Sequence, residues 1–141
     1  MTDWRTSYKD LCKEIEILEL RASDLEFQLR IAKSVCFRGY VTDQYSRVPL
    51  DKALTKYDDV KDELLAVVAI LEHKQQTKAK MEQKMSEFDG LEYQIAYKRD
   101  IEGKPLYLIA EELGYSYDWI RRKSAGIKRK TQSVHKKIAV S

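Results

Sequence analysis

The sequence predicts an all-α protein, in which a long antiparallel helical hairpin of the coiled-coil type precedes a compact C-terminal head of short helices. Apolar residues recur at alternating steps of three and four over two long stretches, which is the repeat of helices that pack side by side. Only two prolines and five glycines occur among the 141 residues. Uninterrupted helices of this length are therefore possible.

The first predicted helix covers about residues 3–36, with Asp3 or Thr2 as its N-cap. Its apolar or small positions follow an unbroken heptad of more than four repeats, and no Gly or Pro interrupts them. These positions are Trp4, Tyr8, Leu11, Ile15, Leu18, Ala22, Leu25, Leu29, Ala32 and Cys36. Four further apolar residues, Ile17, Leu20, Phe27 and Ile31, lie outside this repeat, so the helix is expected to touch more than one neighbour.

The second predicted helix covers about residues 51–88, with Asp51 as a candidate cap, and follows a loop at residues 37–50. Gly39 and Pro49 are loop signals, whereas the apolar residues of 37–53 favour a packed connection or a surface for a partner such as RNA polymerase. The repeat of this helix is Tyr57, Val60, Leu64, Val67, Leu71, Lys74, Lys78, Met81, Met85 and Phe88. The two lysines in it can set the register or mark an exposed segment.

Two heptad helices joined by a compact loop are most simply an antiparallel hairpin, here assigned to residues 1–89. Its remaining apolar faces are expected to pair with a second chain, most simply as a homodimer. The residues assigned to oligomerisation are Leu11, Ile15, Leu18, Leu25, Leu29, Leu64, Val67 and Leu71.

Residues 106–125 carry a pattern in which each position has a physical reason. Ala110 is small where two helices would cross, and Gly114 can adopt a positive φ that turns the chain sharply. Ser116 is a good N-cap for the next helix, and Ile120 is the inward anchor of that helix. With a helix at 91–102 packed across them, and Pro105 as the first residue of the next helix, these residues predict a tri-helical helix-turn-helix head over residues 90–130.

The charge distribution points to the same segment. The last acidic residue is Asp118, so the net charge of +3 for the whole chain hides −5 over residues 1–118 and +8 beyond them. A basic stripe on the second helix of such a motif, followed by a basic tail at 131–141, is the electrostatic footprint of a DNA-binding protein.

The segment from Ile95 to Lys130 resembles the helix-turn-helix of region 4 of bacterial sigma factors. The matching positions are Tyr97, Gly103, Ile109, Ala110, Leu113, Gly114, Ser116, Ile120 and Arg121. A long helical N-terminal part with this head resembles the phage-encoded late-gene transcription regulators of the RinA and ArpU type. The resemblance implies a phage or prophage protein that binds promoter DNA in the bacterial cytoplasm. Two residues depart from the pattern. Lys123 stands at a usually apolar position, so either Ser124 and Ile127 complete the inner face or Lys123 reaches outward. Pro105 replaces the usual Ser-type cap before the first helix of the motif.

The N-terminal part of the second helix is expected to enter the major groove. That prediction places Ser116, Tyr117, Asp118, Arg121, Arg122 and Ala125 at the DNA, with Lys128, Arg129 and Lys130 along the phosphate backbone. Asp118 is read mainly as a favourable charge at a helix N-terminus. Trp119 is expected to pack against the helix at 91–102 rather than face the bases.

Other classes of function fit the sequence less well. His73 and His135 are far apart, Cys12 and Cys36 have no metal spacing, and no nucleophile set or phosphate loop occurs, so neither an enzyme nor a cofactor or metal is expected. No apolar run approaches a membrane span. Two alternatives remain: a phage small terminase subunit that binds packaging-site DNA, and a sigma-like protein that binds RNA polymerase or another regulator.

Overall fold

The structure is a computed structural model that describes residues 3–38 and 49–127, and every regular element in those ranges is helical. This confirms the predicted all-α class. The chain forms two compact units, which for the described residues are 6–38 with 49–80, and 3–5 with 81–127. The division therefore lies at residue 80 rather than at the predicted residue 89, and the first residues of the chain belong with the head.

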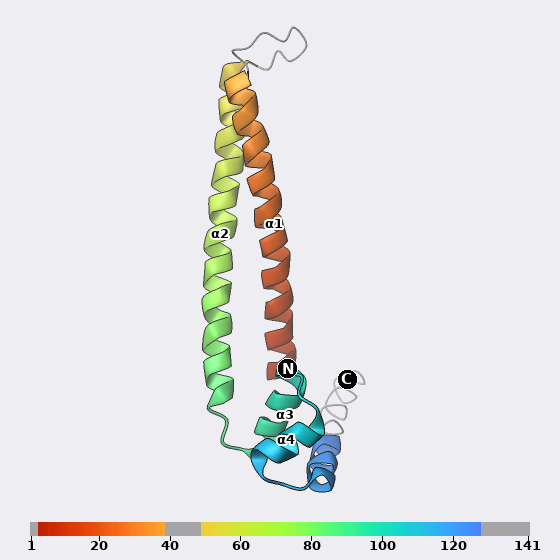
Figure 1. The fold of residues 1–141 in the computed structure, drawn as a ribbon. Helices are drawn as coiled ribbons and strands as arrows, with labels where there is room; N and C mark the ends of the chain where they lie inside the picture. The colour runs from red at the N-terminus through yellow and green to blue at the C-terminus, as the bar shows by residue number, and fades with distance from the viewer. Residues whose placement is uncertain (1–2, 39–48, 128–141) are drawn as a thin grey trace, which may run out of the picture. The chain divides into compact units, whose positions relative to one another are not determined.

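The first unit is an antiparallel helical hairpin, as predicted. Helices α1 (Trp4–Arg38) and α2 (Leu50–Ser86) run side by side in opposite directions through it (Figure 1). Both helices end within a few residues of the predicted limits. Asp51 was expected to cap α2. It does not, because α2 begins one residue earlier and places Asp51 in its first turn.

The heptad residues of both helices form the seam between α1 and α2. Leu25 is fully buried there, Val60 is 3% exposed, and the other seam positions are buried or half-buried. The eight residues that the sequence assigned to oligomerisation all lie in this seam, where they already pack within one chain. They are Leu11, Ile15, Leu18, Leu25, Leu29, Leu64, Val67 and Leu71. Ile15 and Leu25 are buried there, and the other six are half-buried. Their assignment to oligomerisation stays a prediction.

Polar contacts across the hairpin explain how α2 tolerates lysine in its seam. The Lys74 ammonium lies 2.6 Å from the Glu14 carboxylate on α1. Arg21 pairs with Glu63 at 2.5 Å, again from one helix to the other. Lys74 therefore keeps its charge at the edge of the seam and contributes to the register of the two helices.

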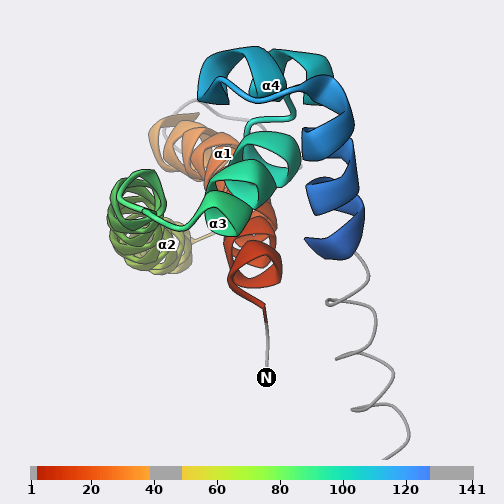
Figure 2. The same ribbon diagram turned by 90° about the horizontal axis from the view of Figure 1, so that it is seen from below.

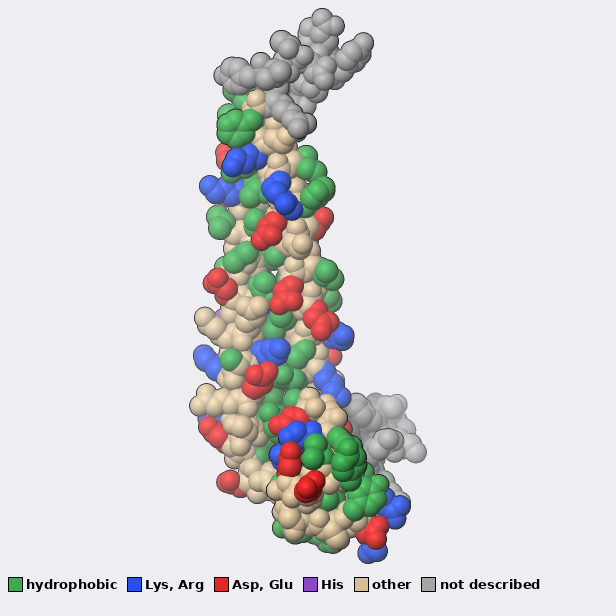
Figure 3. Space-filling model, in the orientation of Figure 1, with side chains coloured by type: hydrophobic (Ala, Val, Ile, Leu, Met, Phe, Trp, Pro, Cys, Tyr) green, Lys and Arg blue, Asp and Glu red, His purple; other side chains and the backbone are tan. Residues whose placement is uncertain are grey.

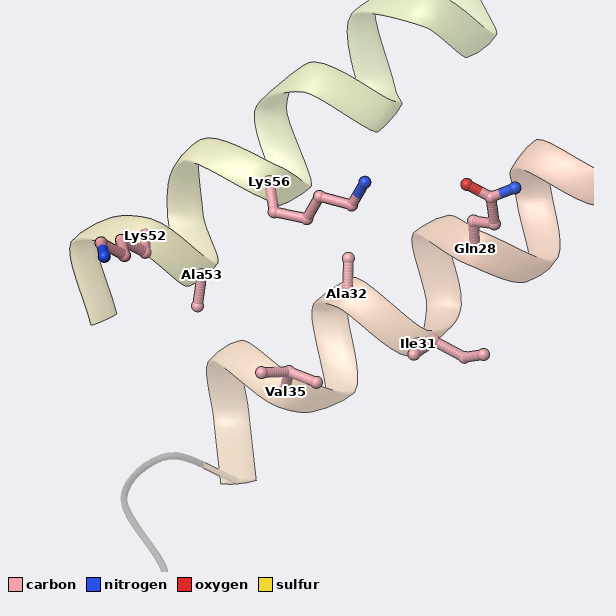
Figure 4. Close-up of a pocket in the computed structure, with 7 residues that line it drawn as sticks. All are labelled: Gln28, Ile31, Ala32, Val35, Lys52, Ala53 and Lys56. Carbon is pink, nitrogen blue, oxygen red and sulfur yellow. The ribbon is translucent and has the colours of Figure 1, made fainter. Parts of the chain in front are cut away.

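A groove of about 280 Å³ opens between the two helices where small residues meet (Figure 4). Ala32 and Ala53 are buried and point into the space between α1 and α2. Ile31, Val35 and the stem of Lys56 complete its walls. Residues 39–48, on which the expectation of a packed connecting loop chiefly rests, lie outside the described residues.

The second unit contains three packed helical segments, which confirms the predicted tri-helical head (Figure 2). They are α3 (Leu91–Ala96) with its continuation η1 (Tyr97–Ile101), α4 (Leu106–Leu113), and a helix at residues 117–127, referred to below as the C-terminal helix. Their shared core consists of Ile95, Ala96, Ile109, Ala110, Ile120 and Ile127.

The sequence predicted one regular helix at 91–102. The structure differs, because the second half of this segment is a π-helix. The Glu102 amide donates to the Tyr97 carbonyl at 3.1 Å, a span of five residues. This wider turn carries Arg99 and Asp100. Pro105 was expected as the first helical residue of α4, and it also stands where the motif usually has a Ser-type cap; the structure agrees with the cap position. Its ψ of 153° is extended, which makes it the N-cap of α4 and leaves Leu106 as the first helical residue.

An aromatic cluster explains why the start of α1 belongs to the head unit. The centroid of the Trp4 ring lies 5.0 Å from that of Phe88 and 6.5 Å from that of Tyr93. Arg5 adds an ion pair to Asp100 on η1. Aromatic pairs at these distances add about 0.5–1.5 kcal/mol beyond the area that they bury.

Candidate nucleic-acid interface

The core of the head fixes which face of the C-terminal helix is inward. Ile109 of α4 and Ile120 of the C-terminal helix are both completely buried, and Ala110 is 4% exposed between them. The sequence predicted each of these positions, and the structure confirms all three. Since no side chain larger than Ala fits easily at a close helix crossing, Ala110 lets α4 and its neighbours approach.

The turn between the two helices depends on Gly114. Its φ of 76° lies in the left-handed region, and its amide donates to the Ala110 carbonyl at 2.9 Å to close α4. A Cβ added there would meet nothing within 4 Å. The requirement for glycine is therefore one of backbone conformation rather than of space, as the sequence predicted.

Ser116 starts the C-terminal helix as predicted. The Trp119 amide donates to the Ser116 hydroxyl at 3.4 Å, and the Ile120 amide donates to the Ser116 carbonyl at 3.1 Å. The first of these is a long N-cap hydrogen bond, and the second begins the regular helical pattern.

The inner face of the C-terminal helix is completed by Ser124 and Ile127, both of which are buried. Lys123 is exposed, and its ammonium lies 5.4 Å from the centroid of the Trp119 ring. Both expected ways of accommodating Lys123 thus occur together. Helix rotation fills the core with other residues, and the lysine lies over an aromatic face.

Arg99 holds the buried Ser124 in place, and sequence reasoning missed it. Its Nη1 donates to the Ser124 carbonyl at 2.9 Å and to the Ser124 hydroxyl at 2.5 Å. Arg99 reaches Ser124 from the π-helical turn η1. A regular helix was predicted there, so no sequence signal identified the contact.

Trp119 is half-buried and packs against the core of the head, as predicted. Its ring also stacks on Tyr115, with centroids 4.5 Å apart and planes 17° from parallel. Tyr115 was not singled out from the sequence. Lys123, Trp119 and Tyr115 thus lie in contact, one on the next, beside the turn that precedes the C-terminal helix.

The residues assigned to the DNA surface are exposed on the outer face of the C-terminal helix. Tyr117, Asp118, Arg121, Arg122 and Ala125 all have exposed side chains. A single weak ion pair occurs among them, since the Arg121 guanidinium lies 4.0 Å from Asp118. Arg122 has no ion-pair partner within the part of the chain that the structure describes. Ser116, the sixth assigned residue, is also exposed at the start of this helix, and Lys128, Arg129 and Lys130 lie outside the described residues.

Two acidic side chains of the head, Glu112 and Asp100, have basic partners close by. Glu112 on α4 binds Lys98 and Lys104, which holds the pKa of its carboxyl below the ordinary value. Burial alone would raise the pKa of Asp100, but hydrogen bonds from Arg99 and Arg5 outweigh it and lower the pKa. Arg121, Arg122 and Lys123 nevertheless form a run of three exposed positive charges on the C-terminal helix, whereas Asp89 and Glu111 are exposed acidic side chains elsewhere in the head.

The described residues contain no cluster of three or more His, Cys, Asp or Glu side chains that could hold a metal ion. Cys12 and Cys36 are free and half-buried. In the described ranges, no helix is both long enough and apolar enough to cross a membrane. Comparison with protein-family models, with curated proteins and with solved structures gives no match for this chain.

Proposed function

We propose that this chain is a sequence-specific DNA-binding transcription regulator that inserts its C-terminal helix into the major groove. One observation carries the proposal: the C-terminal helix buries Ile120, Ser124 and Ile127, while it exposes Arg121 at its flank and Arg122 on the opposite face. A rigid helix with an apolar inner face and a basic outer face, introduced by a tight glycine turn, is the arrangement that reads base edges in a helix-turn-helix.

The exposed side chains fit distinct roles in such a complex. Arg121 and Arg122 can each make a bidentate contact to guanine O6 and N7, which contributes about 1–3 kcal/mol of discrimination per contact. Tyr117, near the N-terminal end of the same helix, can contact sugar or a thymine methyl. Asp118 is placed in the first turn, where a carboxylate is favoured by the helix dipole.

Beyond the described residues, the sequence continues with three further basic residues at 128–130. Lys128, Arg129 and Lys130 are proposed to follow the phosphate backbone, which positions the helix without reading sequence. The assignment to phage or prophage late-gene regulation rests on the resemblance to regulators of the RinA and ArpU type.

The proposal is tested by selecting bound sequences from a random DNA pool with the full chain and measuring affinity by fluorescence anisotropy. The test variant is Arg121→Ala/Arg122→Ala. The control, Lys61→Ala/Lys80→Ala, removes the same charge from two exposed positions on the hairpin. We expect a defined motif for the native chain and the control, and at least a 30-fold weaker affinity for that motif in the test variant.

Each other outcome points elsewhere. Binding without any sequence preference would overturn the proposal of a transcription regulator. It would favour a protein that coats or packages DNA, such as a small terminase subunit. If no DNA is bound at low salt, the head is instead a surface for a protein such as RNA polymerase.

A further inference from the structure

A second apolar seam runs along α1 on the side away from α2. Ile17, Leu20, Phe27 and Ile31 are 64%, 72%, 54% and 50% exposed, although all four are large and apolar. Successive helical residues are 100° apart, so these positions lie nearly opposite the seam that contacts α2. We name these four residues and Asp24 the outer seam. In Figure 3, hydrophobic side chains also lie along the outer edge of the hairpin, away from the line between the helices.

The outer seam has the repeat of a coiled coil rather than a random scatter. With Asp24 included, its members follow each other at steps of three, four, three and four. The seam extends over about 21 Å of helix from Ile17 to Ile31. This repeat is the one expected for packing against a partner helix that lies alongside. The heptad residues of α1 that contact α2, called the inner seam below, have the same repeat. Scattered exposed apolar residues need no explanation, but four large ones on a single helix face, spaced in the repeat of a coiled coil, do.

The charges around the outer seam indicate which helix would cover it. Residues 10–19 of α1 carry a net charge of −3, and residues 28–37 carry +2. A second copy of α1 running in the opposite direction would place the acidic part of each copy beside the basic part of the other. It would also place Ile17 and Leu20 of one copy against Phe27 and Ile31 of the other.

We propose that the outer seam of α1 is a self-association surface, which joins two copies of this chain antiparallel through their hairpins. The interface is isologous, since each copy offers the same stripe. Asp24 lies near the two-fold axis and is satisfied within its own helix by Arg21 at 3.1 Å and Gln28 at 2.8 Å. A polar residue at such a position reduces affinity but favours one register. The inference does not depend on DNA binding.

The test is the mass of the full chain, by sedimentation equilibrium over the micromolar range. The native chain is expected to be a dimer, and Leu20→Glu/Phe27→Glu is expected to raise the dimer Kd at least about 100-fold. Leu65→Glu is the matched control, because Leu65 is 59% exposed but lies on α2. Circular dichroism checks that each variant keeps its helix content. A monomeric native chain, or a dimer that only Leu65→Glu dissociates, would overturn the proposal.

Spin-label distances test the direction of pairing. Labels are placed singly at Glu16→Cys and Ser23→Cys, both exposed positions, in a chain with Cys12→Ser and Cys36→Ser. An antiparallel pair brings the labels at residue 23 close together and separates those at residue 16 by an additional 15 Å or more along the helix axis, at about 1.5 Å per residue. Equal distances at the two positions would mean a parallel pair and contradict the proposed arrangement.

Discussion

Two glycines of the head should respond in opposite directions to the same substitution. Gly114→Ala forces a residue with a Cβ to a φ of 76° and should lower the free energy of unfolding by about 1–2 kcal/mol. Gly126→Ala lies within the C-terminal helix, where an added Cβ meets nothing within 4 Å, and should raise it by up to about 1 kcal/mol. Urea unfolding measures both, and a change of the same sign in the two variants would refute the assignment of the turn.

Asp100 should make the stability of the head depend on pH. Its pKa in the folded chain is lowered, so its contribution is complete above the unfolded value of about 3.9 and is lost as the pH falls through the folded value. Asp100→Asn should cost about 1–2 kcal/mol at pH 7, and its stability should converge with that of the native chain in acid. Asp89→Asn, at an exposed position, is the control for unfolding curves from pH 2 to 7. A constant difference across this range would contradict the role of Asp100.

Single residues were predictable where the physics is local. Gly114, Ser116 and Ile120 each satisfy a need of the turn or the helix that contains them, and the structure places all three as expected. Arg99 was not predictable in this way. Its contact with Ser124 joins residues 25 apart in sequence and depends on a π-helical turn that no residue pattern announces.

At the scale of elements, the inner seam should dominate the stability of the hairpin. Leu25→Ala removes a side chain that is completely buried between α1 and α2, and should cost about 2–4 kcal/mol. Leu65→Ala removes the same atoms from a position that is 59% exposed, and should change stability by less than about 0.5 kcal/mol. Thermal and urea denaturation of the two variants give the comparison. Similar losses in both would mean that the seam is wrongly placed.

The limits of α1 and α2 followed from the sequence because a heptad continues until its apolar residues stop. The short elements were harder to predict. A stretch of eleven residues, 91–101, changes from α to π halfway, and Pro105 occupies the cap rather than the first turn. Elements this short contain few positions on which a periodic pattern can be read, so local preference fixes their exact limits only weakly.

At the scale of the whole molecule, the one-sided charge should appear in the salt dependence of DNA binding. Each phosphate contact made by a basic side chain contributes about 0.9 to the slope of log affinity against log salt. Because Arg121 and Arg122 are proposed to contact bases, Arg121→Ala/Arg122→Ala should lower the affinity for the motif but leave that slope nearly unchanged. A reduction of the slope by about 1 or 2 would place one or both arginines on phosphate and contradict their role in reading bases. Lys61→Ala/Lys80→Ala should leave the slope unchanged, and a reduction in this control would place DNA on the hairpin as well.

A heptad pattern does not reveal whether its partner helix comes from the same chain or another. The inner and outer seams have the same repeat, and the sequence assigned oligomerisation to residues that the hairpin uses for itself. The assignment required knowing which apolar residues remain exposed after α1 and α2 have paired. The helical class and the head needed no such information, because their residues satisfy one another within short stretches of chain.

The polar part of α2 has a consequence for how the molecule loses its structure. Residues 72–80 contain no apolar side chain larger than Ala79, and the boundary between the two compact units falls at their end. Few buried contacts hold this stretch, so its amides should exchange with deuterium sooner than those of residues 60–71. Unfolding of the hairpin and of the head can then proceed as separate cooperative events, and one denaturation midpoint would not describe both.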